Sequence, residues 1–124
     1  MSLLKRAIFA SISTVAHECI SVPEFNAPES QVDLELHVSV MNVSERDGFD
    51  TAYREIPEAE RAANFRSLLA IFTVKDTDNQ PVFSIGDLAD VKKLNSLAIM
   101  RLTDAALRIN KMLKVDAEQI EKNS

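Results

Sequence analysis

Apolar and polar side chains alternate strictly along residues 32–40, and this is the clearest pattern in the chain. Valine and leucine occupy the even positions, while Asp33, Glu35, His37 and Ser39 occupy the odd ones. A period of two predicts a β-strand with one face on a core and the other in water. A single strand leaves its backbone groups unpaired, so it needs a partner. Residues 20–25 are the nearest candidate, which predicts an antiparallel hairpin near residues 20–41.

Residues 3–19 have a helical period instead. At about 100° per residue, several apolar side chains fall within an arc of about 80°. This stripe consists of Leu4, Ile8, Ile12, Val15 and Cys19. We therefore expect an amphipathic helix that docks on another surface. Basic side chains before residues 7–16 also resemble the start of a secretory signal, but hydroxyl side chains make that stretch too polar for one.

Helical signals dominate the chain after residue 43. Ser44 and Asp47 resemble a capping box that opens a helix through about residue 55. Pro57 suits the start of the next helix, and acidic side chains follow it in the first turn. That second helix should supply the thickest part of the core, because its apolar residues follow helical spacing. They are Ala62, Phe65, Leu68, Leu69 and Phe72.

Two more helices are predicted beyond a turn at residues 76–81. Ser84 with Asp87 caps a helix that ends near residue 94, and Ser96 caps the last helix, residues 96–113. The last helix has a broad inward apolar face. This face consists of Ala98, Leu102, Ala105, Ala106, Ile109 and Leu113. On its polar side, Asp104 and Arg108 have the spacing of an ion pair.

Met100 and Leu107 lie together on a separate flank of the last helix, one heptad apart. Two interpretations of this flank remain open. It is either a second contact with the core or an interaction patch, a role that suits the flexible methionine side chain.

Together these elements predict a mainly α (α+β) fold with four to five amphipathic helices and one small antiparallel β-hairpin. The length of 124 residues fits a single domain, which we expect to span residues 1–113. Residues 114–124 are polar without a strong apolar stripe, and we expect them to fray as a C-terminal tail.

Composition excludes several classes of function. Gly48 and Gly86 are the only glycines, too few for a dinucleotide-binding or ATP-type phosphate loop. The net charge of −5 argues against nucleic acid as a partner, and no apolar run is long enough to cross a membrane. One cysteine and two histidines make a zinc site improbable, and an unpaired cysteine suits a reducing cytoplasm.

No group of residues predicts catalysis or metal binding. Asp76 opens a stretch that resembles a calcium loop, but Pro81 stands where that loop needs glycine. His17 and Cys19 would face different directions on a helix, so we expect a buried thiol and surface imidazoles. The carboxylates of residues 33 and 35 share one strand face, where solubility explains them. We therefore expect no enzyme, no cofactor and no metal.

The order of several short motifs resembles the tail assembly chaperones of long-tailed bacteriophages. The matching segments run from residue 1 to about residue 113. They are Met1-Ser2-Leu3-Leu4-Lys5-Arg6-Ala7-Ile8, Val22-Pro23-Glu24-Phe25, the alternating strand, Ser44-Glu45-Arg46-Asp47-Gly48-Phe49, residues 66–72, the turn at residues 76–81 with Val82-Phe83, and residues 101–110. The sequence departs from the family pattern in two segments. Phe25 replaces a common tryptophan, and Asn79-Gln80 replaces Asp-Gly, although asparagine also tolerates a positive φ.

The resemblance implies a non-enzymatic protein of the host cytoplasm that is absent from the mature virion. It implies two partners, the tape measure protein and the tail-tube protein, whose polymerisation such chaperones promote. A holding protein needs apolar surface beyond its own core. We therefore expect Met100, Leu107, Leu4 and Ile8 to contact a partner or a second copy in a homo-oligomer. The alternatives are a small structural virion protein, such as a head–tail joining component, and a helix-turn-helix regulator.

Overall fold

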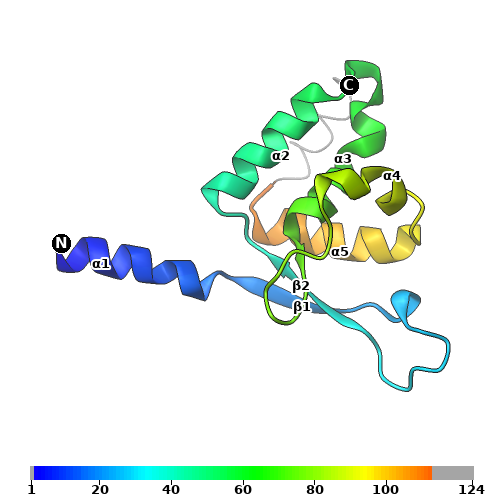
Figure 1. Cartoon of the computed structure of the whole chain (residues 1–124), viewed down its shortest axis with the longest axis horizontal. Helices are drawn as coiled ribbons and strands as arrows, with labels where there is room; N and C mark the ends of the chain where they lie inside the picture. The colour runs from blue at the N-terminus through cyan, green and yellow to red at the C-terminus, as the bar shows by residue number, and fades with distance from the viewer. Residues whose placement is uncertain (1, 113–124) are drawn as a thin grey trace.

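The structure is a computed structural model that describes residues 2–112. Figure 1 shows a helical arm that extends away from a body of helices and strands. In chain order the α-helices and β-strands, with short 3₁₀ helices labelled η, are α1 (Leu3–Ala10), η1 (Ser11–Thr14), β1 (His17–Ser21), η2 (Pro23–Phe25), β2 (Glu35–Ser39), α2 (Val43–Glu55), η3 (Glu58–Glu60), α3 (Arg61–Thr73), β3 (Val74–Lys75), η4 (Ile85–Asp87), α4 (Leu88–Val91) and α5 (Ser96–Ile109). The predicted mainly α fold with an antiparallel hairpin is confirmed.

The sheet is antiparallel, with the strand order β1-β2-β3. The hairpin is confirmed, but the partner of β2 is residues 17–21, with Cys19 opposite His37, rather than residues 20–25. Pro23 lacks a backbone N–H and begins η2, so β1 ends before it. The strand β3 was not predicted, because two residues are too few to show a period.

The first helix ends at Ala10, not at residue 19 as predicted. Just after it, the hydroxyl groups of Ser11, Ser13 and Thr14 donate to backbone carbonyls three residues earlier. Such bonds compete with helix continuation. The carbonyl of Ala16 already accepts from Val40 beside the β1–β2 ladder, so the following residues belong to the sheet rather than to the helix.

Helix α2 begins two residues earlier than predicted, because its cap is Asn42 rather than Ser44. Asn42 and Glu45 form the capping box, each side chain accepting from the other's backbone N–H. The predicted end of α2 at Glu55 is confirmed. Glycine at position 48 allows α3 to approach closely, because a Cβ there would lie 2.9 Å from Cε1 of Phe72.

Helix α3 supplies much of the core, as predicted, although Ala62 is exposed and Phe72 is only half-buried. The ring of Phe65 meets that of Phe49 edge-on, with centroids 5.9 Å apart. The buried apolar core joins α2, α3, α5 and the sheet. It includes Val22, Leu36, Val38, Phe49, Phe65, Leu68, Leu69, Ala70, Ile71, Val74, Val91, Ala98, Ile99, Leu102, Ala105, Ala106 and Met112.

Helix α5 packs against α3 on one side and against the sheet on the other. Its cap is Asn95 rather than Ser96, and the predicted inward face is buried at residues 98, 102, 105 and 106. The predicted Asp104–Arg108 pair is absent from the ion pairs within residues 2–112. Asp104 pairs instead with Arg66, and Arg108 pairs with Glu18. The predicted tail and Leu113 lie outside the described residues.

Candidate functional site

The four predicted contact residues divide between two separate surfaces. Leu4 and Ile8 lie on α1, with exposed fractions of 72% and 57%. Met100 lies on α5 and is 44% exposed, whereas Leu107 is half-buried and packs against the core. Because α1 extends away from the body, the structure does not bring the two pairs together (Figure 1). The packing of Leu107 fits the interpretation as a core contact.

The first surface is the N-terminal arm, which we define as residues 3–14. Neither α1 nor η1 contains a buried residue. The arm therefore exposes several large apolar side chains within a short stretch of chain. They are Leu3, Leu4, Ile8, Phe9 and Ile12. Lys5 and Arg6 are the only charged residues of residues 2–16, so the arm is also basic.

The second surface is the α5 patch, which we define as Leu94, Leu97 and Met100. Their exposed fractions are 36%, 64% and 44%. A shallow hollow of about 180 Å³ lies beside it and is lined in part by Leu94, Met100, Arg66 and Lys92. The patch is thus apolar with a basic edge. The sequence did not predict Leu94 and Leu97 as contact residues, because they lie where α4 ends and α5 begins, and the apolar period of neither helix extends across this junction.

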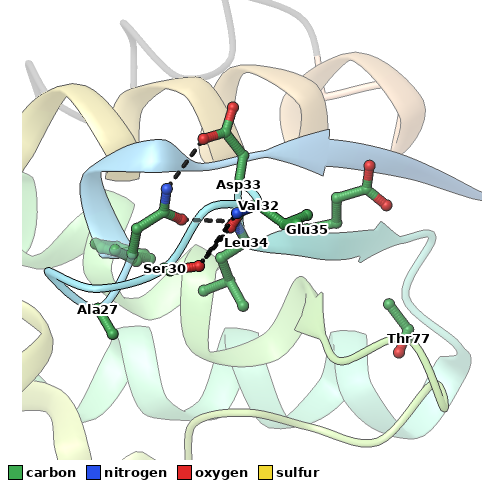
Figure 2. Close-up of a pocket in the computed structure, with 9 residues that line it drawn as sticks. Ala27, Ser30, Val32, Asp33, Leu34, Glu35 and Thr77 are labelled. Carbon is green, nitrogen blue, oxygen red and sulfur yellow. Dashed lines mark hydrogen bonds between the residues drawn. The ribbon is translucent and has the colours of Figure 1, made fainter.

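A third surface, the hairpin groove, lies beside the connection between β1 and β2. It is an open hollow of about 720 Å³. Its lining consists of Phe25, Asn26, Ala27, Ser30, Val32, Asp33, Leu34, Glu35 and Thr77 (Figure 2). The sequence pattern assigned residues 32 and 34 to the core, but β2 begins only at Glu35. These two apolar side chains are consequently 77% and 41% exposed.

The segment before β2 is held in place by one asparagine. The side chain of Asn26 donates to Asp33 at 3.0 Å and accepts from the backbone N–H of Leu34 at 2.6 Å (Figure 2). The backbone N–H of Val22 donates to the carbonyl of Leu34 at 2.7 Å. The groove is therefore formed by hydrogen-bonded loop backbone, a long-range arrangement that periodicity does not reveal.

The outer face of the sheet holds the residues with potential for chemistry. Cys19 is exposed, not buried as expected, and its thiol donates to Oε2 of Glu35 at 3.4 Å. This hydrogen bond raises the pKa of the Cys19 thiol, which is the opposite of what a nucleophilic cysteine requires. The rings of His17 and His37 stack with centroids 4.3 Å apart, and Nδ1 of His37 is buried with no hydrogen-bond partner within residues 2–112.

Neither a metal site nor a membrane-spanning helix is present among residues 2–112. Within residues 2–112 no three His, Cys, Asp or Glu side chains are grouped to hold a metal ion. One oxygen of Asp76 accepts from the backbone N–H groups of Asp78 and Gln80, and Asn79 has φ of 64°, as a tight turn requires. None of the helices in this range is both long and apolar enough to span a bilayer.

Two arginines of α5 hold the first strand and the residues after it. Both terminal guanidinium nitrogens of Arg101 donate to the carboxylate of Glu24, at 2.8 and 2.6 Å, and one also donates to the carbonyl of Ser21. This pairing lowers the pKa of the Glu24 carboxyl. Arg108 pairs with Glu18 in β1. These contacts fix the strand from which the arm emerges.

No family model matches the sequence, and no curated protein matches it. The fold, in contrast, has a solved counterpart among phage assembly proteins. It is similar to the structure of the bacteriophage HK97 tail assembly chaperone, with a TM-score of 0.56 and 21% sequence identity. The similarity covers 85% of this chain and 94% of that chain. The resemblance drawn from the sequence motifs therefore agrees with the fold.

Proposed function

We propose that this protein is a non-enzymatic phage tail assembly chaperone that binds the tape measure protein. It promotes polymerisation of the tail-tube protein in the host cytoplasm and is absent from the mature virion. The observation that carries this proposal is the fold shared with the HK97 tail assembly chaperone over most of both chains. The exposed apolar surfaces described above support it, because a reversible holding protein must offer apolar contacts beyond its own core.

The α5 patch is the surface that best suits a helical client. Leu97 and Met100 lie three residues apart on one helix, so they form a ridge that can pack against an apolar stripe of another helix. Methionine adapts its shape to different partners. Lys92 at the adjacent hollow favours a client helix with an acidic side chain next to its apolar stripe.

The test is co-expression with the tape measure protein of the same phage, followed by purification through a tag on the chaperone. The double variant Leu97→Glu/Met100→Glu should lose the client, because it places two charges in the contact. Its circular dichroism spectrum should remain unchanged, since neither side chain is buried in the core. The matched control is Val43→Glu, which places a charge at a 79% exposed apolar position on α2 and should retain the client.

Two outcomes would contradict the proposal. One is that the unaltered protein captures no tape measure protein and leaves its solubility unchanged. The other is that mass spectrometry finds the protein as a stoichiometric component of purified virions. The second result would identify a structural virion protein, such as a head–tail joining component.

A further inference from the structure

The hairpin groove carries charges of one sign only. Its lining contains two carboxylates and no lysine, arginine or histidine. Every charged residue that is adjacent in sequence to a lining residue is also acidic. The set consists of Asp33 and Glu35 in the lining, with Glu24, Glu29, Asp76 and Asp78 next to it. The groove is therefore a local region of negative charge.

The two carboxylates of the lining are held in place without a cation. The amide of Asn26 donates to Asp33 at 3.0 Å, and the thiol of Cys19 donates to Glu35 at 3.4 Å. Neither carboxylate forms an ion pair within residues 2–112, whereas Glu24, just before the groove, pairs with an arginine of α5. Neutral donors thus orient the two carboxylates but leave their charges uncompensated. A basic side chain of a partner would form charge-assisted hydrogen bonds with them.

The apolar part of the groove is already formed in the free protein. Phe25 packs against the core, whereas the side chains of Val32 and Leu34 are exposed beside it. The backbone of Leu34 is hydrogen-bonded on both sides, to Asn26 through its N–H and to Val22 through its carbonyl. A preformed site loses little conformational freedom on binding. An apolar groove of this kind suits the apolar stripe of an amphipathic helix.

The groove and the α5 patch lie at the same end of the molecule but differ in charge. Arg101, the residue after Met100 of the patch, pairs with Glu24. Glu24 in turn precedes Phe25 of the groove, and Figure 1 shows the start of α5 and the connection between β1 and β2 on the same side of the body. Lys92 lines the hollow beside the patch, whereas the charges in the groove are carboxylates. Opposite charges next to apolar surfaces select different partners.

We propose that the hairpin groove is a second docking site, which binds an amphipathic helix of a partner protein with lysine or arginine side chains beside its apolar stripe. The stripe covers Val32 and Leu34, and the basic side chains pair with Asp33 and Glu35. The protein thereby holds two segments of opposite charge at one end, the acidic one on the α5 patch and the basic one in the groove. This goes beyond the proposed function, which uses the α5 patch alone.

Two synthetic peptides of about four helical turns test the charge preference of this site. Both carry the same leucine stripe, which is flanked by lysine in one peptide and by glutamate in the other. Fluorescence anisotropy with the full chain should show at least about tenfold tighter binding of the lysine peptide, and high salt should reduce this preference. The variant Asp33→Asn/Glu35→Gln should weaken binding of the lysine peptide about fivefold, because two exposed ion pairs are lost. The matched control, Asp47→Asn/Glu58→Gln, removes the same charge at exposed positions outside the groove and should bind like the unaltered chain.

The apolar part of the groove is tested by a variant that keeps both carboxylates. Val32→Ser/Leu34→Ser should weaken binding of the lysine peptide about tenfold, because it removes apolar contact. Its circular dichroism spectrum should match that of the unaltered chain, since both side chains are exposed. In nuclear magnetic resonance spectra, the lysine peptide should shift the backbone amide signals of residues 25–35 and leave those of residues 94–100 in place.

Equal affinity for the two peptides would overturn the proposal. So would an equal loss of binding in Asp47→Asn/Glu58→Gln, because net charge alone would then explain the preference, or signal shifts confined to other parts of the chain. A change in the mass of the peptide-free protein on substitution of Val32 and Leu34, measured by sedimentation velocity, would assign the groove to a second copy instead. Co-purification of the tape measure protein through the α5 patch does not depend on any of these results, so their failure leaves the proposed function intact.

Discussion

At the scale of single residues, Glu45 connects two parts of the fold. One of its carboxylate oxygens accepts from the backbone N–H of Asn42 and completes the capping box of α2. The other accepts from Nζ of Lys75 at 2.8 Å, and that lysine side chain is only 9% exposed. A single carboxylate thus fixes the start of α2 and neutralises a buried cation on β3.

Replacing Asn42 should lower the stability of the fold, whereas replacing Ser44, the cap predicted from the sequence, should not. Asn42→Ala removes the acceptor for the N–H of Glu45 and should lower the free energy of unfolding by about 1 kcal/mol. Ser44→Ala should change it by less than about 0.5 kcal/mol. Urea unfolding followed by circular dichroism measures both values, and equal losses would contradict the assignment of the cap.

At the scale of one element, the buried side of α5 should contribute far more to the stability of the fold than its exposed side. Leu102 is fully buried between α3 and the sheet, so Leu102→Ala should cost about 2–5 kcal/mol through lost contacts and a cavity. Leu97 is 64% exposed, so Leu97→Ala should change stability by less than about 0.5 kcal/mol. Thermal and urea unfolding of the two variants would separate them. A large loss for Leu97→Ala would show that the α5 patch belongs to the core.

The elements also show what the sequence could and could not predict. Helices α3 and α5 were predictable because their apolar period continues for several turns. The predicted starts of α2 and α5 were wrong by two residues and one residue. Asparagine is as good a helix cap as serine, so the sequence does not show that Asn42 and Asn95 are the caps rather than Ser44 and Ser96. The sequence pattern assigns the first three residues of β1, 17–19, to the first helix, since Cys19 continues its apolar stripe, and only pairing with β2 places these residues in the sheet. The hairpin groove depends on long-range loop contacts, which have no periodic signal.

At the scale of the whole molecule, the arm and the body should be energetically independent. A variant that lacks residues 2–14 removes no buried side chain and preserves the carbonyl of Ala16 that accepts from Val40. Its free energy of unfolding should stay within about 0.5 kcal/mol of that of the full chain. Calorimetry of both proteins at a concentration where each is monomeric measures the difference. A substantial drop in melting temperature would instead show that the arm packs on the body.

The two arginine contacts of α5 have a mechanical consequence. Tension on the arm enters the body at His17 and acts along the axis of β1 (Figure 1). A pull in this direction strains the bonds between β1 and β2 together, whereas a sideways pull would open them one after another. Arg108 pairs with Glu18 near the start of this strand, and Arg101 donates to the carbonyl of Ser21 at its end. A force applied to the N-terminal arm is thus transmitted to the body while β1 stays paired with β2.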